Sequence, residues 1–259
     1  MDLRELGARN TLVNNRHPWE LARLEVTTDI LKNNDLLASK TFLDLGCGDS
    51  FFINTLYNQN QLNATCFGVD INFEDPMILE FNKENPKIQF FKTLDNLADN
   101  FKGTIDVVFL MDVIEHIEDD IAFLKMVAQY SFITPQTTFV ITVPAFRSLF
   151  ASHDVFLGHY RRYDNQLLEN NISKSGYKTF EVGYFFSLLL LPRWIQMLKE
   201  KLVKPKETTG LVEWQGSGFK TKTIANILYL DYKFSKIARK IGIKLPGLSN
   251  YALCRPLEL

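Results

Sequence analysis

Two glycines directly after a short apolar run are the first residues whose spacing points to chemistry. They lie in TFLDLGCGDSFF (residues 41–52). Because glycine adopts positive φ and lets a ligand approach the backbone, Gly46 and Gly48 predict a ligand-binding turn between a strand and a helix. Asp70 closes the next apolar run, 22 residues after Gly48. A carboxylate at that distance typically binds ribose hydroxyls, so the ligand is predicted to contain adenosine.

The charge of this turn indicates which adenosine ligand it binds. A dinucleotide fingerprint, G-x-G-x-x-G, has a third glycine where this chain has Phe51. Asp44 and Asp49 flank the glycines, and two carboxylates disfavour a diphosphate but suit a cation. S-adenosylmethionine carries a sulfonium and an ammonium group and no phosphate, so we predict it as the cofactor. One alternative is that the glycines form an ordinary tight turn that binds no ligand. Another is that the protein is a nicotinamide-dependent oxidoreductase.

A second group of polar residues lies in VPAFRSLFASHDVFLGHYRRYD (residues 143–164). This segment follows the fifth predicted strand and is expected over the cofactor, where a methyl acceptor would sit. Because histidine titrates near neutral pH, His153 is predicted as the general base, with Asp154 as its orienting partner and His159 as the alternative. The predicted substrate contacts are Tyr160, Arg161, Arg162 and Tyr163.

Two other interpretations of this segment stay open. The two arginines could pair with acids while Tyr163 is buried. His153, Asp154 and His159 could instead bind a metal ion, but their spacing is not typical of a metal geometry, and we predict no metal.

These residues need elements that hold them at one edge of a sheet. Short apolar runs alternate with helix-length segments, which favours an α/β protein with a mostly parallel, buried sheet. The expected strands are 41–45, 64–70, 88–92, 105–111, 138–143, 177–186 and 250–255. The predicted divisions are an N-terminal helical lid (1–40), a cofactor-binding domain (41–186), a helical insertion (187–244) and a terminal strand (245–259).

The insertion is basic although the whole chain is not. Between residues 193 and 244, twelve Lys and Arg stand against four acids, a local charge of +8, whereas the chain carries −1. The insertion could contact an anionic membrane surface, bind an anionic or lipid-linked acceptor, or form a dimer face. We favour a solvated cap whose apolar seam packs on the sheet domain. The apolar seam consists of Ile227, Leu230, Phe234, Ile237 and Ile241.

Composition sets the remaining limits. The chain has 259 residues, 46% hydrophobic and 23% charged, as in an ordinary globular protein. Its three scattered cysteines and an N-terminus without an apolar leader favour a cytoplasmic location, with contact to the inner membrane surface through 184–244 as an option. A nucleic-acid partner is not predicted, because the basic residues are confined to the insertion.

Three stretches together resemble one protein family. FLDLGCGDSFF, FGVDIN and IDVVFLMDVIEHIEDD, in this order, are similar to the motifs of class I S-adenosylmethionine-dependent methyltransferases. The resemblance covers about residues 15–185 plus the last strand, and it departs at Asp49 and Ser50, where the family often has a small residue. It implies a Rossmann-like, doubly wound sheet of seven strands whose last strand, SNYALCRP, is antiparallel.

The resemblance also implies roles for individual residues. Glu115 would support the site through hydrogen bonds, and Asp112 could alternatively cap a helix. In RHPWELAR, Trp19 and Arg23 are further expected contacts of the lid, although Trp19 could equally belong to the core. The cofactor contacts implied by the resemblance are Asp44, Gly46, Cys47, Gly48, Asp70, Ile71, Thr93, Leu94, Met111, Asp112 and His116.

We therefore predict an S-adenosylmethionine-dependent methyltransferase. Its acceptor atom would be an oxygen, nitrogen or carbon of a small molecule, a glycan or a lipid-linked compound. A non-catalytic binding module with the same fold is the alternative that is not an enzyme.

Overall fold

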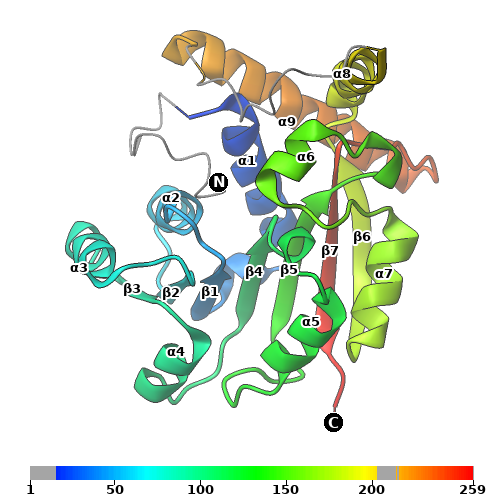
Figure 1. Cartoon of the computed structure of the whole chain (residues 1–259). Coiled ribbons are helices and arrows are strands. Elements are labelled where there is room, and N and C mark those ends of the chain that lie inside the picture. Colours follow the sequence, from blue (N-terminus) through cyan, green and yellow to red (C-terminus); the bar gives the residue numbers. More distant parts are fainter. Residues whose placement is uncertain (1–15, 203–213, 215, 259) are drawn as a thin grey trace.

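Seven strands form a single sheet at the centre of the protein (Figure 1). The computed structural model describes residues 16–202, 214 and 216–258. The strand order is β3-β2-β1-β4-β5-β7-β6, and β7 runs antiparallel to both of its neighbours. All seven predicted strands and the antiparallel last strand are confirmed. Their bounds are β1 Thr41–Leu45, β2 Thr65–Val69, β3 Ile88–Phe91, β4 Val107–Met111, β5 Thr138–Pro144, β6 Tyr177–Phe185 and β7 Ser249–Pro256.

Helices cover both faces of the sheet, as a buried parallel sheet requires. Short 3-10 turns complete the connections at η3 Leu36–Ala38, η4 Ile114–His116, η5 Arg147–Leu149 and η6 Ser187–Leu189. The helices are α1 Pro18–Asn33, α2 Phe51–Asn60, α3 Asp75–Glu84, α4 Leu94–Asn100, α5 Asp120–Ala128, α6 Ser152–Leu157, α7 Asn165–Lys174, α8 Leu190–Leu202 and α9 Gly218–Lys240.

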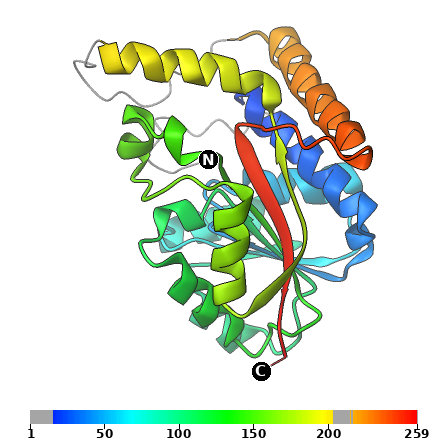
Figure 2. The same ribbon diagram turned by 90° about the vertical axis from the view of Figure 1, so that its right-hand side faces the viewer.

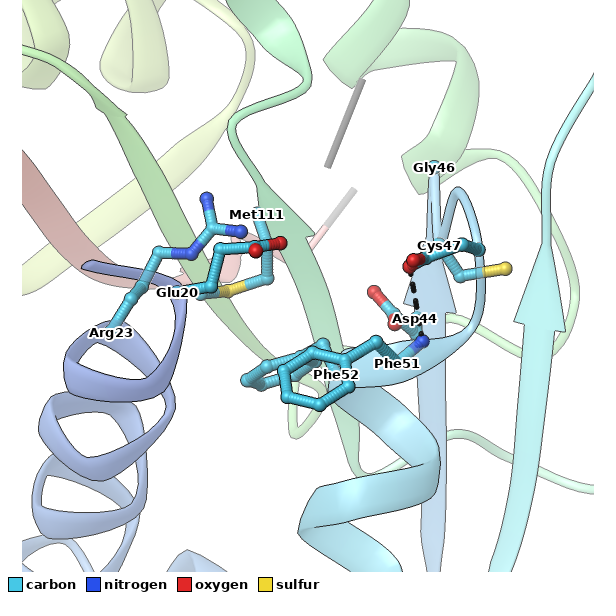
Figure 3. A pocket seen from close by; sticks show the side chains of 9 residues that line it. Glu20, Arg23, Asp44, Gly46, Cys47, Phe51, Phe52 and Met111 are labelled. Atoms are coloured by element: carbon cyan, nitrogen blue, oxygen red, sulfur yellow. Dashed lines mark hydrogen bonds between the residues drawn. The ribbon is translucent and has the colours of Figure 1, made fainter. Parts of the chain in front are cut away.

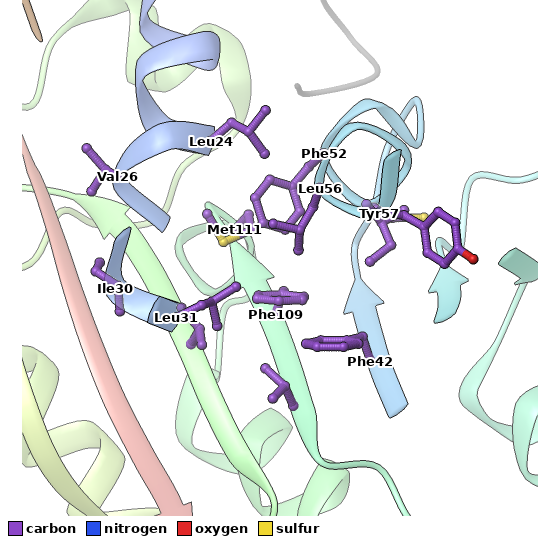
Figure 4. Close-up of a cluster of buried hydrophobic side chains, with 14 of the residues drawn as sticks. Leu24, Val26, Ile30, Leu31, Phe42, Phe52, Leu56, Tyr57, Phe109 and Met111 are labelled. Atoms are coloured by element: carbon purple, nitrogen blue, oxygen red, sulfur yellow. The ribbon is translucent and has the colours of Figure 1, made fainter. Parts of the chain in front are cut away.

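The core against α1 and α2 is rich in aromatic side chains (Figure 4). Phe42 of β1 and Phe109 of β4 stack with ring centroids 6.0 Å apart, and Phe52 of α2 meets Phe109 edge-on at 5.1 Å. Such pairs contribute about 0.5–1.5 kcal/mol beyond their buried area. This packing fixes the start of α2 against the ends of β1 and β4, where the predicted ligand turn lies.

The strand order reverses between β1 and β4. From β1 the chain builds outward through β2 to β3, and it then returns to place β4 on the other side of β1. The helices that follow β1 and β4 therefore diverge, which leaves a crevice at the carboxyl ends of these two strands. The fold thus places the glycine turn after β1 and the acidic segment after β4 beside each other.

The helical insertion differs from its expectation in one respect. The apolar seam of α9 was expected to pack on the sheet domain, and this is wrong: Ile227 is 48% exposed and Phe234 is 64% exposed. The opposite side of α9, which carries Ala225, Leu228 and Tyr232, packs inward and faces α1. Both sides of this helix carry apolar residues at helical spacing, so the periodicity alone does not say which side is buried.

Candidate active site

The turn after β1 depends on its two glycines. Gly46 has φ +79° and Gly48 has φ +54°, a region that favours glycine. A Cβ atom on Gly46 would lie 2.6 Å from a methyl group of Val113, so no side chain fits there. The Gly48 amide donates to Oδ2 of Asp70 at 2.9 Å. The turn is therefore held open as a bare backbone surface and is tied to the acid at the end of β2.

A cavity opens between this turn and the N-terminal end of α1 (Figure 3). Its volume is about 380 Å³ including the space at its open mouth. Acids outnumber cations on its wall, since Glu20, Asp44 and Asp49 face one arginine, Arg23. Of the residues predicted to bind the cofactor, those that line the cavity are Arg23, Asp44, Gly46, Cys47 and Met111.

Asp44 is an acid of this cavity whose pKa is changed by burial. Its side chain is only 1% exposed, and Oδ2 has no hydrogen-bond partner among the described residues. Burial raises the pKa of Asp44 to about 7. A buried carboxylate with an unpartnered oxygen is suited to a cationic ligand. The residues present therefore fit S-adenosylmethionine, as predicted from the charge of the turn.

Asp70 and Ile71 lie at the end of β2 beside this cavity. Oδ1 of Asp70 accepts from the backbone and side-chain nitrogens of Asn72 at 2.9 and 3.0 Å, which fixes the carboxylate. Ile71 is 74% exposed and offers an apolar surface next to it, as an adenine ring would require. In contrast, the Thr93 hydroxyl caps α4 by accepting from the amide of Asn96, and Leu94 is buried in the core.

Arg23 closes the cavity from the side of α1. Its guanidinium pairs with Asp112 and lies 4.7 Å from the ring centre of Trp19. Asp112 has φ +57° and accepts a hydrogen bond from Thr142 at 3.0 Å. It does not cap the following turn η4, whose N-cap residue is Val113. The Trp19 ring thus packs against the Arg23 guanidinium. The ion pair of Arg23 with Asp112 connects α1 to the end of β4.

Two residues at or beside this cavity were missed in the sequence. Arg16 pairs with Asp49 and stacks over Phe51, with 4.2 Å between the guanidinium carbon and the ring centre. Glu20 lines the cavity and accepts from the backbone amide of His17 at 3.2 Å. The spacing of four residues between Arg16 and Glu20, typical of a helical ion pair, was the available signal.

The second group of predicted residues centres on Asp154. This carboxylate is fully buried and lies 3.0 Å from Nδ1 of His159. It also accepts from Arg162 at 2.7 Å and from Arg193 at 2.6 Å. Burial alone would raise the pKa of Asp154, but the hydrogen bond from His159 and the charge of Arg162 hold it well below its usual range. Asp154 is therefore an anion that fixes its neighbours.

Asp154, predicted to orient His153, is bonded to His159, the alternative base. The turn at Gly158 brings residue 159 back onto the carboxylate. Nδ1 of His159 faces this anion, so its proton is expected on Nδ1 and Nε2 is left as an acceptor. His153 is half-buried, and burial together with the charge of Arg193 lowers its pKa.

The four predicted substrate contacts divide into two kinds. Tyr160 is 54% exposed, whereas Arg161 donates to the carbonyl of Ile117 at 2.8 Å. Arg162 is buried between Asp154 and the Ala145 carbonyl, and the hydroxyl of Tyr163 donates to Asp120 at 2.7 Å. The last three side chains thus fix the segment to the domain, which agrees with the structural alternative noted for them.

Glu115 and His116 lie between the two groups. Within residues 16–202, 214 and 216–258, one set of three side chains could hold a metal ion: Glu115, His116 and His159, with ligand atoms within 4.8 Å of one another. The carboxylate of Glu115 is fully buried without a hydrogen-bond partner among these residues, and burial raises its pKa well above the usual range. The metal-binding alternative considered from the sequence consists of a different set, His153, Asp154 and His159. Asp154 of that set already pairs with Arg162 and Arg193.

His17 at the start of α1 gives a testable pH dependence. Its Nδ1 accepts from the Trp19 amide at 3.3 Å, and burial lowers its pKa to about 4, whereas the ordinary value is 6.5. Since the unfolded chain takes up this proton first, the free energy of unfolding should fall as pH drops from 6.5 towards 4. His17→Asn keeps an N-cap acceptor without a titrating group.

The His17→Asn chain should therefore lose less stability over that pH range than the wild type. Urea unfolding at a series of pH values measures this difference. Parallel slopes for the two proteins would show that His17 titrates freely in the folded state.

The fold and the site define a class I S-adenosylmethionine-dependent methyltransferase. Residues 19–182 match the family model described as a methyltransferase domain, so the chain belongs to that family. A curated relative, the ubiquinone biosynthesis O-methyltransferase of Escherichia coli O127:H6, is 28% identical over 96 residues. That region is 36% of this chain and 39% of the relative, so the match spans about two fifths of the relative's length.

Solved structures agree in fold. A phosphoethanolamine N-methyltransferase of Haemonchus contortus, in complex with S-adenosylhomocysteine, has a TM-score of 0.53 and 15% identity, covering 90% of this chain and 52% of that one. The [4+2]-cyclase SpnF has a TM-score of 0.55 and 14% identity, covering 95% and 85%. These likenesses show the fold alone. The family shows that the enzyme is a methyltransferase with S-adenosylmethionine as its cofactor, which sets aside the nicotinamide alternative and the non-catalytic one.

Proposed function

We propose that this enzyme transfers the methyl group to a hydroxyl oxygen of a small-molecule acceptor. The observation that carries the proposal is the pair formed by buried, ionised Asp154 and His159. A hydroxyl is a weak nucleophile unless its proton is removed, whereas a neutral amine needs no base. A histidine whose Nδ1 faces a fixed anion has Nε2 free to accept such a proton. The curated relative quoted above is an O-methyltransferase, which supports the same atom.

In this proposal the other residues bind and position. Asp44, Asp70 and the backbone at Gly46 and Gly48 hold the cofactor, with Ile71 against its adenine. Bound S-adenosylmethionine supplies the methyl group and a sulfur leaving group. The protein mainly supplies proximity and alignment, which are worth about 7–11 kcal/mol of the barrier in well-oriented reactions. Tyr160 and His153 contact the acceptor, and Arg162 and Arg193 keep Asp154 ionised.

We include glycans and lipid-linked compounds with hydroxyl groups among the proposed acceptors. The three cysteines are free and buried, as expected in a reducing compartment, which supports a cytoplasmic location. A lipid-linked acceptor would reach the enzyme at the inner membrane surface, in contact with residues 184–244.

The proposal is tested with matched acceptors. The full chain is incubated with cofactor labelled in its methyl group and with pairs of compounds that differ only in hydroxyl against amine, such as a phenol and the corresponding aniline. Label is expected in the hydroxyl member. Label confined to the amine would refute oxygen as the acceptor atom. Calorimetric binding of S-adenosylhomocysteine, measured separately, shows whether the protein is intact in either case.

A further inference from the structure

Exposed apolar side chains concentrate on one part of the described chain. Of the large hydrophobic residues that are exposed, most lie between residues 188 and 243, on η6, α8, α9 and the residues just after α9. Globular proteins scatter such residues singly and rarely gather them on neighbouring helices. On α9 they are Phe219, Ile224, Ile227, Leu230, Phe234 and Ile237; on α8 they are Leu191, Trp194, Ile195, Leu198 and Leu202.

The outer side of α9 carries two exposed lysines beside these apolar residues. Lys222 and Lys240 are 18 residues apart, which is five full turns at 3.6 residues per turn, so both lie on one flank of the helix. This flank borders the apolar side, because Phe219 and Ile237 each precede one of these lysines by three residues. Between the two, Lys233 is half-buried and pairs with Asp29 of α1. The acid within α9, Asp231, accepts from the Leu188 amide and is thus engaged on the inside.

Helix α8 carries a second exposed apolar side. Figures 1 and 2 both place α8 and α9 at the upper end of the molecule, beyond the sheet. Leu191, Trp194, Leu198 and Leu202 recur at helical spacing on the exposed side of α8, and Lys199 lies next to them in the sequence and is exposed. The inner side of α8 carries Arg193, which is buried. Two neighbouring helices therefore present apolar outer sides with lysines beside them.

We propose that the outer sides of α8 and α9 attach this enzyme peripherally to a membrane surface that contains anionic lipids. Amphipathic helices with Trp, Phe and Leu on one side and Lys along its border lie in the interface in this way. The lysines complement the negative headgroups. A protein partner fits less well, because the cores of protein interfaces are depleted of lysine. None of the helices in the described ranges could span a bilayer.

The inner side of α8 connects this surface to the acceptor segment. Arg193 donates to Asp154 at 2.6 Å, and Glu200 accepts from the Ser152 hydroxyl at 2.8 Å. The helix that would rest on the membrane is thus bonded directly to α6, which carries His153. An amphiphilic acceptor dissolved in the bilayer would have a short route to the site. The attachment itself does not depend on the proposed function.

Co-sedimentation of the full chain with vesicles tests this proposal. The two probes are vesicles of phosphatidylcholine alone and of phosphatidylcholine mixed with phosphatidylglycerol. We expect binding to the mixed vesicles, and the double variant Phe234→Glu/Ile237→Glu should partition at least about tenfold more weakly. Lys222→Glu/Lys240→Glu should reduce binding to mixed vesicles by about tenfold or more. Leu79→Glu and Lys83→Glu, on exposed α3, are matched controls that should bind as the wild type does.

Three outcomes would overturn the proposal. The wild type could stay in the supernatant with both kinds of vesicle, or it could bind them equally whatever the lipid charge. Light scattering could instead show a dimer that Phe234→Glu/Ile237→Glu converts to a monomer, without vesicle binding. That last result would assign the surface to a second copy of the chain. All variants change exposed side chains, and unchanged binding of S-adenosylhomocysteine confirms that each one is folded.

Discussion

Asp44→Asn is expected to weaken binding of S-adenosylmethionine by about tenfold to a hundredfold, the range for loss of a charge-assisted contact. Asp44 is buried in the cofactor cavity with an unpartnered oxygen, and a cationic ligand would supply the missing partner. The asparagine keeps the shape and removes the negative charge. Calorimetric titration above pH 7 measures the loss. Asp95→Asn, an exposed acid on α4, is the matched control and should bind normally.

The pH dependence of this binding separates a charge effect from a packing effect. The pKa of Asp44 is about 7 without a ligand, so below pH 7 the side chain must lose a proton before it can pair with a cation. The affinity of the wild type should then fall about tenfold per pH unit as pH decreases below 7, relative to Asp44→Asn. If both proteins show the same pH dependence, Asp44 does not pair with the cofactor's charge.

The same pKa predicts the opposite effect on stability. Because the folded protein holds this proton up to about pH 7 while the ordinary carboxyl loses it near 3.8, folding is favoured at low pH and that contribution is lost as pH rises through 7. Above pH 7, Asp44→Asn should therefore be more stable than the wild type, although it binds the cofactor more weakly. Thermal unfolding at two pH values tests this, and a destabilised variant at both would contradict it.

The strands and the cofactor turn could be predicted because local sequence determines them. Buried parallel strands are short apolar runs, as TFLDL and VVFLM show, and no distant residue is needed to recognise them. A turn with positive φ favours glycine, so the two glycines at positions 46 and 48 indicate the backbone geometry of this turn. The position of Asp70 follows from the strand that carries it.

The partners of buried charges could not be predicted in the same way. Asp154 has acceptor sites for several donors: Arg193 reaches it from α8, and His159 and Arg162 reach it from the segment between α6 and α7. Sequence distance favoured the adjacent His153, whereas the bond to His159 depends on the turn at Gly158. In the same manner, the two sides of α9 differ little in apolar content, and the contact of α1 with Tyr232 decides which is buried.

His159→Ala is expected to lower kcat by about 10²- to 10⁴-fold, the usual contribution of a general base. Nε2 of His159 is the acceptor left free by the bond between Nδ1 and Asp154, so its removal leaves the hydroxyl proton without a base. KM and the affinity for S-adenosylhomocysteine should change little. His153→Ala is the comparison variant: in the proposed function His153 contacts the acceptor without removing its proton, so kcat of this variant should fall less than about tenfold.

A structural role for His159 would give a different result. Removing a positioning residue lowers kcat as well, but added imidazole can replace only a missing base. Partial recovery of His159→Ala activity in imidazole, with no effect on the wild type, would therefore identify proton transfer as the lost step. The assignment is wrong if His159→Ala keeps the turnover of the wild type on a hydroxyl acceptor. It is also wrong if His153→Ala loses more activity than His159→Ala, since the base would then lie on α6 itself.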